Sequence, residues 1–567
     1  MEAKTALPIK RRKTRSTPRG RSVEPEALAQ VQARLGDTPR RRDLLIEYLH
    51  NIQDAFGHLS AAHLVALARE TGLSHTEVYE VASFYHHFDV VRESDTAPPS
   101  LTVRVCDSIT CDMFGADELV ERLNKILGKD VRIQRVPCVG RCHSAPVAVV
   151  GRHTIENANE ARIKTCVEAN IIDAVSEPYI NLDAYRNEGG YSLYESLIAG
   201  DISAKTIIGK LEDSGLRGLG GAGFPAGRKW NIVRGMNAPR LMAVNIDEGE
   251  PGTFKDRFYL EQDPHRFLEG VLIAAYVVDV SEIYIYLRDE YAACRQILQH
   301  ELHALRLAYS LVHPPVYLRR GAGAYICGEE SAMIESIEGK RGMPRLRPPF
   351  VAEVGLFGRP TLEHNMETLY WVRDIVERGP EWFTSQGRHG RKGLRSFSVS
   401  GRVRKPGVHL APAGITISEL IDEYCGGMLD GHVFHAYFPG GASGGILPAS
   451  MSDIPLDFDT LNEYGCFIGS AAIVVLSDKD DIKRAALNAM RFFAHESCGQ
   501  CTPCRVGTAK ATQLMQQPHW DQPLMQALAQ TMMDASICGL GQAAPNPMLC
   551  VMKYFPEELT DDSKCWK

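Results

Sequence analysis

The segment ESCGQCTPCRVG, residues 496–507, places Cys498, Cys501 and Cys504 within seven positions. Three thiols so close together in a loop that also contains Gly and Pro serve no packing purpose. They indicate metal ligation, because a [4Fe–4S] cube needs one thiolate at each of four corners, and a tight triplet with a remote fourth cysteine suits it. Zinc is the alternative, although structural zinc sites usually use two C-x2-C pairs.

The fourth ligand of this triplet must come from elsewhere in the chain. Cys538, in the sequence SICGLGQ, is the best candidate, since Gly539 and Gly541 let the backbone come close to a bulky cluster. Cys550 is the competitor. We call the triplet together with Cys538 the C-terminal cysteine set.

A second group of cysteines, the N-terminal cysteine set, consists of two pairs with C-x4-C and C-x3-C spacing. Each pair stands in a loop after a predicted strand, and two pairs from two loops suit a [2Fe–2S] rhomb in which each iron takes two thiolates. Zinc remains an alternative here too. The set comprises Cys106, Cys111, Cys138 and Cys142. Six isolated cysteines are expected to pack as small hydrophobic residues: Cys166, Cys294, Cys327, Cys425, Cys466 and Cys565.

The overall composition indicates a globular protein of several domains. The 567 residues are 44% hydrophobic and 23% charged, and a net charge of −7 argues against nucleic-acid binding. The basic stretch KRRKTRSTPRGRS predicts a disordered tail over residues 1–23, and no apolar segment follows it to form a signal peptide. The longest apolar runs are too short for membrane insertion. Fifteen cysteines without a signal peptide favour metal ligands in a reducing, cytoplasmic compartment.

Hydrophobic periodicity predicts a multidomain α/β protein and divides the chain into five parts that follow the basic tail. Ser74 and Glu77 form a predicted capping box at the start of a helix. The expected parts are a helical segment over 24–94, a small α/β unit over 100–180, a larger strand–loop–helix region over 187–395, short strands over 396–478, and a helical bundle over 480–567.

Three loops in the larger α/β region point to a nucleotide-type cofactor. They are RGLGGAGFPAGRKW (217–230), NIDEGEPGTFKDR (245–257) and RGAGAYICGEES (320–331), which we call the glycine loop, the acidic loop and the third loop. Glycines let the backbone lie against a phosphate or a ring, although the glycine loop fits neither the G-x-G-x-x-G fingerprint nor a P-loop. We expect each loop to follow a strand, so that all three converge on one crevice of a doubly wound sheet.

These three loops and ESCGQCTPCR together resemble the flavin-binding, NADH-oxidising subunit of respiratory complex I. Residues 24–180, with VASFYHHF (81–88) and the N-terminal cysteine set, resemble its thioredoxin-like [2Fe–2S] neighbour. FSVSGRVRKPGVHLAPAGITISELI (397–421) resembles the β-grasp, SLBB-like domain of that family. The resemblance implies a Rossmann-like FMN- and NAD-binding domain at 187–395, a thioredoxin-like domain at 100–180, and FMN, NAD(H), one [4Fe–4S] cluster and one [2Fe–2S] cluster as cofactors.

The resemblance also implies roles for individual residues. His364 and Arg347 stand where the family commonly has Asn and Lys, and both retain hydrogen-bonding groups. The FMN side would comprise Gly218, Gly220, Lys229, Asn245, Asp247, Glu248, Tyr325, Gly328, Glu329, Asn365 and Thr368. The NAD side would comprise Phe224, Glu250, Glu330, Arg347 and Phe350.

The fusion of two complex I subunits in one chain resembles the beta, or diaphorase, subunit of soluble NAD-linked formate dehydrogenases that contain molybdenum or tungsten. It also resembles the diaphorase subunit of NAD-linked [NiFe] hydrogenases, which often lack the N-terminal cluster ligands. Because all four cysteines of the N-terminal set are present, formate dehydrogenase is favoured, with hydrogenase and complex I as alternatives. Formate itself would react on a Mo/W catalytic alpha subunit that carries further iron–sulfur clusters, because the chain has no molybdopterin-type signal.

The implied reaction needs no catalytic nucleophile. A nicotinamide transfers a hydride and an iron–sulfur cluster a single electron, and a flavin converts between the two. The protein therefore has to position the two rings and exclude water. The C-terminal cysteine set would link the flavin to the partner subunit, and the [2Fe–2S] cluster is expected on the far side of the flavin.

Overall fold

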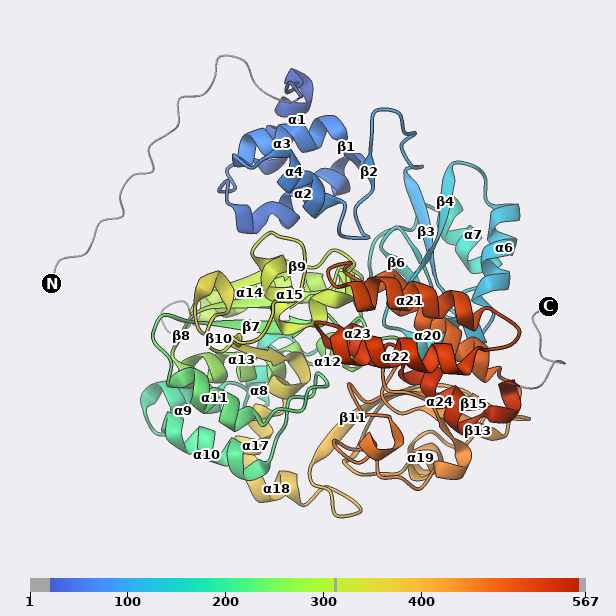
Figure 1. The fold of residues 1–567 in the computed structure, drawn as a ribbon. Coiled ribbons are helices and arrows are strands. Elements are labelled where there is room, and N and C mark those ends of the chain that lie inside the picture. Colours follow the sequence, from blue (N-terminus) through green and yellow to red (C-terminus); the bar gives the residue numbers. More distant parts are fainter. Residues whose placement is uncertain (1–20, 310–313, 560–567) are drawn as a thin grey trace.

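The structure, a computed structural model, describes residues 21–309 and 314–559 (Figure 1). Cys565 and nearly all of the predicted basic tail lie outside the described residues. The described chain forms a mixed α/β protein of the expected class, with four sheets and a group of C-terminal helices. No helix within the described ranges has both the length and the apolar character needed to cross a bilayer.

The N-terminal helices form a small unit on the larger α/β region. The capping box is confirmed: Ser74 Oγ accepts a hydrogen bond from Glu77 N, and Ser74 N donates to the Glu77 carboxylate. Arg319 joins the two parts, because it donates to the carboxylates of Asp43 and Glu47 at 2.8 and 2.9 Å. The elements are α1 (Pro25–Leu35), α2 (Leu45–Phe56), α3 (Ala61–Thr71), α4 (His75–Ala82), β1 (Leu59–Ser60) and β2 (Val90–Val91).

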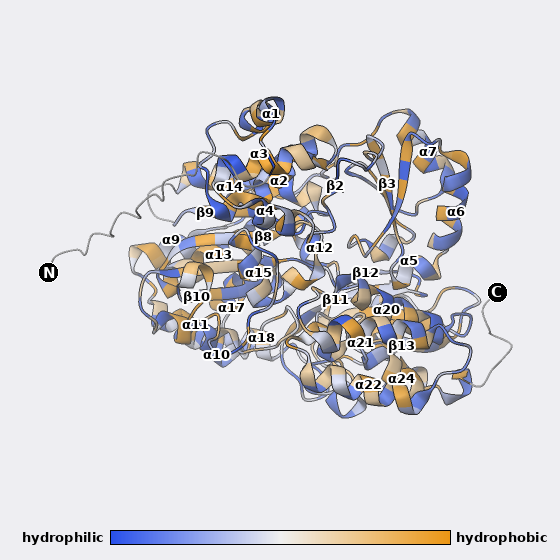
Figure 2. Cartoon of the chain, turned by 45° about the horizontal axis from the view of Figure 1, so that its top comes forward, coloured by the Kyte–Doolittle hydropathy of each residue, from blue (hydrophilic) through white to orange (hydrophobic). Residues whose placement is uncertain are grey.

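The next part is the small α/β unit that carries the N-terminal cysteine set. Its sheet has the order β4-β3-β5-β6, with β3 parallel to β4 and antiparallel to β5. Helix α6 covers it with an apolar face, and hydrophilic and hydrophobic residues alternate along this helix in Figure 2. The elements are β3 (Leu101–Cys106), α5 (Ile109–Met113), α6 (Ala116–Ile126), β4 (Val131–Val136), β5 (Ala148–Val150), β6 (His153–Ile155) and α7 (Glu160–Glu168).

The third part has a parallel sheet of order β10-β7-β8-β9. The order in which the chain adds strands reverses at β7, which has β8 on one side and β10 on the other. In such sheets, ligands bind beyond the carboxyl ends of the strands at this point. The strands are β7 (Arg240–Ile246), β8 (Val280–Leu287), β9 (Val316–Arg320) and β10 (Thr361–Asn365). The surrounding helices include α10 (Ala204–Ser214), α11 (Ala226–Arg234), α12 (Lys255–Gln262), α13 (Pro264–Val278), α14 (Ala292–Ala308), α15 (Glu330–Ile337) and α16 (Met366–Tyr370).

A five-stranded sheet and a group of helices complete the chain. The sheet has the order β12-β11-β15-β13-β14, in which only β11 and β15 are parallel. Helix α20 buries Ala486, Met490 and Phe493, which lie on one face of the helix at spacings of three and four residues. The elements are β11 (Leu394–Gly401), β12 (Gly407–Pro412), β13 (Phe434–Phe438), β14 (Leu447–Pro448), β15 (Ala472–Ser477), α20 (Ile482–Glu496), α21 (Thr502–Met515), α22 (Gln522–Ala535), α23 (Gly539–Ala543) and α24 (Asn546–Tyr554).

Candidate functional site

A cavity of about 1000 Å³ lies beyond the carboxyl ends of β7 and β10. We call it the central cavity. The glycine loop, the acidic loop and the third loop all line it, and the β11–β15 sheet region and helices α22 and α23 close its other side. All the residues that the resemblance placed at FMN or NAD line this cavity, with the exception of Thr368. Its size is that of a cofactor or ligand pocket, at the top of the usual range of about 300–1,000 Å³.

The glycine loop does not follow a strand, so that expectation is wrong. It lies between helices α10 and α11, and its ends are joined by an antiparallel bridge between Arg217 and Pro225. A Cβ on Gly220 would lie 3.0 Å from Cβ of Asn365, so glycine allows a close approach to the end of β10. The loop therefore reaches the end of β10 from its place between two helices.

The acidic loop continues directly from β7, and its first turn is held by hydrogen bonds of Asn245. Asn245 donates from Nδ2 to Gly328 O at 2.9 Å and accepts from Asp247 N at 3.0 Å, which ties the acidic loop to the third loop. Asp247 Oδ2 is buried and has no hydrogen-bond partner among the described residues, and burial raises the pKa of this carboxyl well above its usual range. An unpaired buried oxygen is costly, so its position at the cavity fits a ligand that donates a hydrogen bond.

Glu248 also lines the cavity, but its carboxylate supports the start of helix α12. It accepts hydrogen bonds from Asp256 N at 2.8 Å, Arg257 N at 3.1 Å and the Tyr291 hydroxyl at 2.8 Å. Burial and the neighbouring Asp256 carboxylate raise the pKa of Glu248 to about 7. Its hydrogen-bonding capacity is thus used largely within the protein.

Glu250 joins the acidic loop to two other walls of the cavity. The Tyr325 hydroxyl donates to Glu250 Oε2, and Ser443 donates to Oε1 from its backbone N at 2.7 Å and its hydroxyl at 2.8 Å. Burial raises the pKa of Glu250. Tyr325 precedes α15 in the chain and Ser443 belongs to the β11–β15 sheet region, so Glu250 fixes three loops relative to one another.

Two lysines place positive charge in the central cavity. Lys229 donates from Nζ to Glu363 O at 3.0 Å and lies 3.2 Å from the Glu363 carboxylate. Lys255 is almost fully buried, 2.7 Å from Asp256 Oδ1 and 3.1 Å from Glu367 Oε2. Lys255 was not singled out from the sequence, where its only signal is its place in the acidic loop.

The open side of the cavity carries four of the five residues expected at NAD, all except Glu250. Phe224 and Phe350 are 39% and 54% exposed, which is unusual for large aromatic side chains and suits the stacking of a planar ring. Arg347 donates to Glu330 Oε1 at 2.8 Å and lies 3.4 Å from Glu329 Oε1. The mouth therefore combines two apolar rings with one guanidinium group and two carboxylates.

Thr368 and His364 both form hydrogen bonds to other residues of the protein. Thr368 Oγ1 accepts a hydrogen bond from Leu219 N at 2.9 Å, so this residue fixes the glycine loop from behind and does not line the cavity. His364 lines the cavity, and its Nε2 is 2.7 Å from Trp230 Nε1, which must be the donor because an indole N–H cannot accept. Burial lowers the pKa of His364 well below its usual range, which is consistent with a neutral ring.

The C-terminal cysteine set lines a small cavity of its own. All four sulfur-bearing residues border it, with Cys498 and Cys501 in the loop before α21, Cys504 within α21, and Cys538 before α23. Cys550 lies elsewhere, with its sulfur 3.6 Å from that of Cys466. The structure therefore favours Cys538 over Cys550 as the fourth member.

The small cavity and the central cavity share a wall. Ile326 and Leu540 border both of them. Ile326 lies in the third loop, and Leu540 lies in α23 two residues after Cys538. A cluster on the C-terminal cysteine set would thus be separated from the central cavity by a single layer of side chains.

The N-terminal cysteine set is gathered at one buried site. Its four cysteines are at most 5% exposed, and the Cys138 and Cys142 sulfurs are 3.2 Å apart. Phe254 of the acidic loop packs against these two cysteines, and Arg288 donates to Cys138 O at 2.7 Å. The set therefore abuts the acidic loop, whose neighbouring residues Thr253 and Lys255 line the central cavity.

Sequence models of four protein families match separate regions of the chain. The Nuo51 FMN-binding domain matches residues 211–374, and the thioredoxin-like [2Fe–2S] ferredoxin matches residues 31–170. The NADH-ubiquinone oxidoreductase-F iron–sulfur binding region matches residues 484–562, and the SLBB domain matches residues 396–447. These matches support iron–sulfur clusters rather than zinc in both cysteine-bearing regions.

Two NADH oxidoreductase subunits are similar in sequence to this chain. The chain is 40% identical over 392 residues to an NADH-quinone oxidoreductase subunit of Rhizobium meliloti, covering 66% of this chain and 93% of that protein. It is 41% identical over 377 residues to the mitochondrial NADH-ubiquinone oxidoreductase 51 kDa subunit of Neurospora crassa, covering 62% and 76%, respectively. The chain belongs to the Nuo51 family of FMN-binding NADH dehydrogenase subunits.

A solved structure matches the Nuo51-like region and the N-terminal region together. The crystal structure of NAD+-reducing [NiFe]-hydrogenase in the H2-reduced state has 30% sequence identity and a TM-score of 0.81, and the match covers 92% of both chains. The air-oxidised state has the same identity and TM-score and covers 92% of this chain and 94% of that one. The present chain, a member of the Nuo51 family, thus contains the [2Fe–2S] unit and the FMN unit in one polypeptide.

As a member of these families, the chain binds FMN, a [2Fe–2S] cluster and a [4Fe–4S] cluster. Its residues fit these groups: the unpaired Asp247 oxygen and the glycine approach at Gly220 suit a flavin nucleotide, and both cysteine sets are free of disulfides. Sequence reasoning missed Ser443, Lys255 and Glu363 at the cavity. Ser443 gave no signal, because its place beside Glu250 depends on packing between loops almost 200 residues apart.

Proposed function

We propose that this chain is the beta, or diaphorase, subunit of a cytoplasmic, NAD-linked formate dehydrogenase with a molybdenum or tungsten alpha subunit. The observation that carries the proposal is the completeness of both cysteine sets in one chain. The N-terminal set is assembled and buried against the acidic loop, and the C-terminal set adjoins the central cavity across Ile326 and Leu540. A diaphorase with both cluster sites intact matches the formate dehydrogenase type of fusion better than the hydrogenase type.

The inner part of the central cavity would hold FMN. Gly218 and Gly220 would present backbone to it, Lys229 and Lys255 would supply positive charge for the phosphate, and Asp247 would accept a hydrogen bond. When bound, FMN supplies a carrier that takes up two electrons together and releases them singly. The remaining proposed contacts are Asn245, Glu248, Tyr325, Gly328, Glu329 and Asn365, with Thr368 acting through the glycine loop.

The outer part would hold NAD. Phe224 and Phe350 would stack with its rings, and Arg347 and Glu330 would bind its polar groups. Glu250, held by Tyr325 and Ser443, would orient the nicotinamide end at the inner boundary. The walls of the cavity would orient the two rings and shield them from water, so the proposed contribution of the chain is orientation and desolvation.

The cysteine sets would define the electron route. Cys498, Cys501, Cys504 and Cys538 would bind a [4Fe–4S] cluster, which would supply one-electron transfer to the partner. Only residues such as Ile326 and Leu540, which border both cavities, would separate it from the flavin site. Cys106, Cys111, Cys138 and Cys142 would bind the [2Fe–2S] cluster beyond the acidic loop, as a branch or electron store.

The test is purification of the native complex. We expect formate-dependent reduction of NAD+ and molybdenum or tungsten in the co-purifying alpha subunit. Isolation of this chain with a nickel-containing partner, and hydrogen-dependent NAD+ reduction, would reject the formate assignment. NADH-dependent reduction of an artificial acceptor by the isolated chain tests the diaphorase activity separately.

The second candidate is the diaphorase subunit of an NAD-linked [NiFe] hydrogenase. It is favoured by the match to the NAD+-reducing [NiFe]-hydrogenase structure, which covers 92% of both chains. Both candidates require the same flavin and nicotinamide site, so the metal of the partner subunit distinguishes them.

A further inference from the structure

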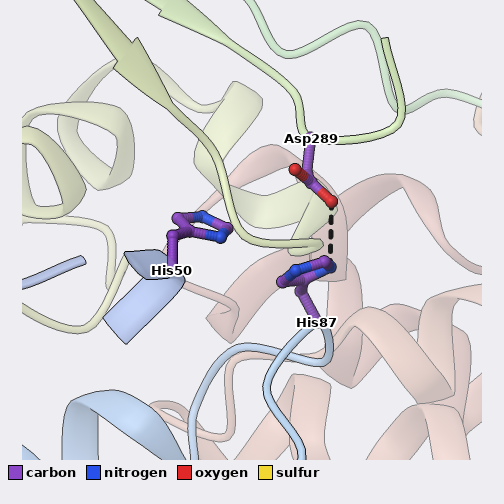
Figure 3. A group of neighbouring side chains, drawn as sticks. All are labelled: His50, His87 and Asp289. Carbon is purple, nitrogen blue, oxygen red and sulfur yellow. Dashed lines mark ion pairs between the residues drawn. The ribbon is translucent and has the colours of Figure 1, made fainter. Parts of the chain in front are cut away.

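Outside the two cysteine sets, the described residues contain two groups of three side chains that bring potential metal ligands within 4.8 Å of one another. One consists of His50, His87 and Asp289 (Figure 3). The other consists of His86, His495 and Glu496. Although His86 and His87 are neighbours in sequence, they belong to different groups. The two groups differ in the charged side chains that surround their carboxylates.

The first group is a structural contact. His87 Nδ1 is 2.9 Å from Asp289 Oδ2, the ion pair drawn in Figure 3, and His50 Nε2 is bonded to Gly321 O at 2.9 Å. Two guanidinium groups, those of Arg295 and Arg320, also bond to Asp289 Oδ1. Their positive charge satisfies the carboxylate and opposes a cation. This group fastens the N-terminal helices to the parallel sheet.

In the second group, no guanidinium group of the described residues is paired with the carboxylate. Its carboxylate, Glu496, is 5% exposed, and its ion pairs within the described chain are with the two histidines only. His495 Nδ1 lies 3.1 Å and His86 Nδ1 lies 3.8 Å from Glu496 Oε1. The two rings are tilted by 50° with centroids 4.0 Å apart. Among the described residues, this buried carboxylate thus pairs with two imidazoles and with no arginine or lysine.

The carboxylate is also held in place from behind. Tyr325 N donates to Glu496 Oε2 at 2.8 Å, which leaves Oε1 directed at the imidazoles. Such a bond to a ligating carboxylate is the outer-shell support that metal sites generally have. The side chains of His86 and His495 are 44% and 48% exposed, so an ion can reach them from solvent.

We propose that His86, His495 and Glu496 form a binding site for zinc or a similar borderline divalent cation. Two imidazoles and one carboxylate are three of the four ligands of a tetrahedral zinc ion, and the exposed side leaves the fourth position to water. His86 follows α4 of the N-terminal unit, whereas His495 and Glu496 end α20, just before Cys498. A bound cation would therefore link the N-terminal unit to the helix that leads into the C-terminal cysteine set.

The chain provides a matched control. His300 and Glu301 form the same sequence pair, with His300 Nδ1 3.1 Å from Glu301 Oε1, and His300 is also exposed. The other imidazole paired with Glu301, that of His265, is fully buried and bonds to Oε2. Within the described ranges, this pair therefore lacks a second exposed imidazole.

The experiment is a zinc titration of the chelator-treated holoenzyme, read by bound zinc after equilibrium dialysis. We expect one additional zinc per chain in the wild type and in His300→Ala, and at least about tenfold weaker binding in His86→Ala and His495→Ala, since even outer-shell changes cost about 10- to 100-fold. Unchanged flavin and iron contents verify that the variants are intact. X-ray absorption should show nitrogen and oxygen neighbours with imidazole scattering.

Three results would overturn the proposal. They are the absence of additional zinc in the wild type, equal zinc affinity in the wild type and both histidine variants, and sulfur neighbours in the absorption spectrum. The last would place the zinc at one of the cysteine sets. None of these readouts depends on the partner subunit or on formate.

Discussion

Asn245 and Asn365 lie directly opposite one another at the carboxyl ends of the parallel strands β7 and β10. Asn365 donates to Asp256 Oδ2 at 2.7 Å and accepts from Glu367 N at 3.0 Å, whereas Asn245 bonds to the third loop. The Asn365 amide therefore fixes the starts of α12 and α16, and the Asn245 amide fixes the third loop, around one point of the sheet. At this point the strand order of the sheet reverses, and the central cavity lies beyond these strand ends.

The first prediction concerns the approach of the glycine loop to this point. Gly220→Ala would place a Cβ 3.0 Å from Cβ of Asn365, so either the loop or the strand end must move. We expect weaker FMN retention, measured as flavin absorbance per chain after dialysis. Gly209→Ala, in helix α10 with no atom within 4 Å of the new Cβ, is the control and should retain flavin. Equal flavin contents in both variants would contradict the placement of FMN at this loop.

The second prediction concerns Glu250. Glu250→Gln keeps the size of the side chain but removes the charge that receives bonds from Tyr325 and Ser443. A hydrogen bond to a charged group contributes about 1.5–3 kcal/mol, so we expect NADH oxidation to slow by at least about tenfold. Steady-state turnover with an artificial acceptor measures this. Bound FMN should be unchanged, and its loss from the variant would show that Glu250 belongs to the flavin site.

The third prediction distinguishes the two candidates for the fourth cluster ligand. Cys538→Ala should lower iron by about four atoms per chain, because it removes one corner of the cube. Cys550→Ala should keep the iron, since the Cys550 sulfur faces Cys466 at 3.6 Å and lies outside the small cavity. Iron and acid-labile sulfide analysis decides between them. The reverse pattern would assign the cluster to Cys550.

Sequence reasoning predicted those features that depend on local spacing. The capping box at Ser74 follows from short-range hydrogen bonds, and the strand that ends at Cys106, at the first pair of the N-terminal cysteine set, follows from residue periodicity. The cavity-lining residues were found through long family motifs, which carry information that composition and periodicity alone do not.

Features that depend on packing between distant segments could not be predicted. The glycine loop follows helix α10, which its turn residues alone did not reveal. The contact of Ser443 with Glu250 joins parts of the chain almost 200 residues apart. The shared wall of Ile326 and Leu540 exists only because α23 packs against the third loop, and no spacing rule encodes that arrangement.

The fourth prediction concerns the pH dependence of stability. The pKa of Glu248 is raised to about 7 in the folded protein, above the usual 4.5, so the folded state binds the proton more tightly than the unfolded state does. This stabilisation is present below pH 4.5 and is lost as the pH rises through 7, by at most about 3 kcal/mol. Glu248→Gln cannot titrate. We therefore expect the Tm of the wild type, relative to the variant, to fall between about pH 5 and pH 7.5, and a flat or rising difference would refute the assignment.

The fifth prediction concerns the room that the cluster needs beside Cys538. A Cβ on Gly541 would lie 2.5 Å from Ser536 Oγ and 2.8 Å from Cys504 Cβ, whereas a Cβ on Gly539 would meet nothing within 4 Å. Gly541→Ala must therefore move the α23 backbone, Ser536 or the proposed cluster ligand Cys504, and we expect iron loss and a weaker low-temperature EPR signal of the reduced [4Fe–4S] cluster. Gly539→Ala, two residues away in the same helix, should retain both. If the two variants lose iron equally, the close packing of α23 against Cys504 is not what holds the cluster site together.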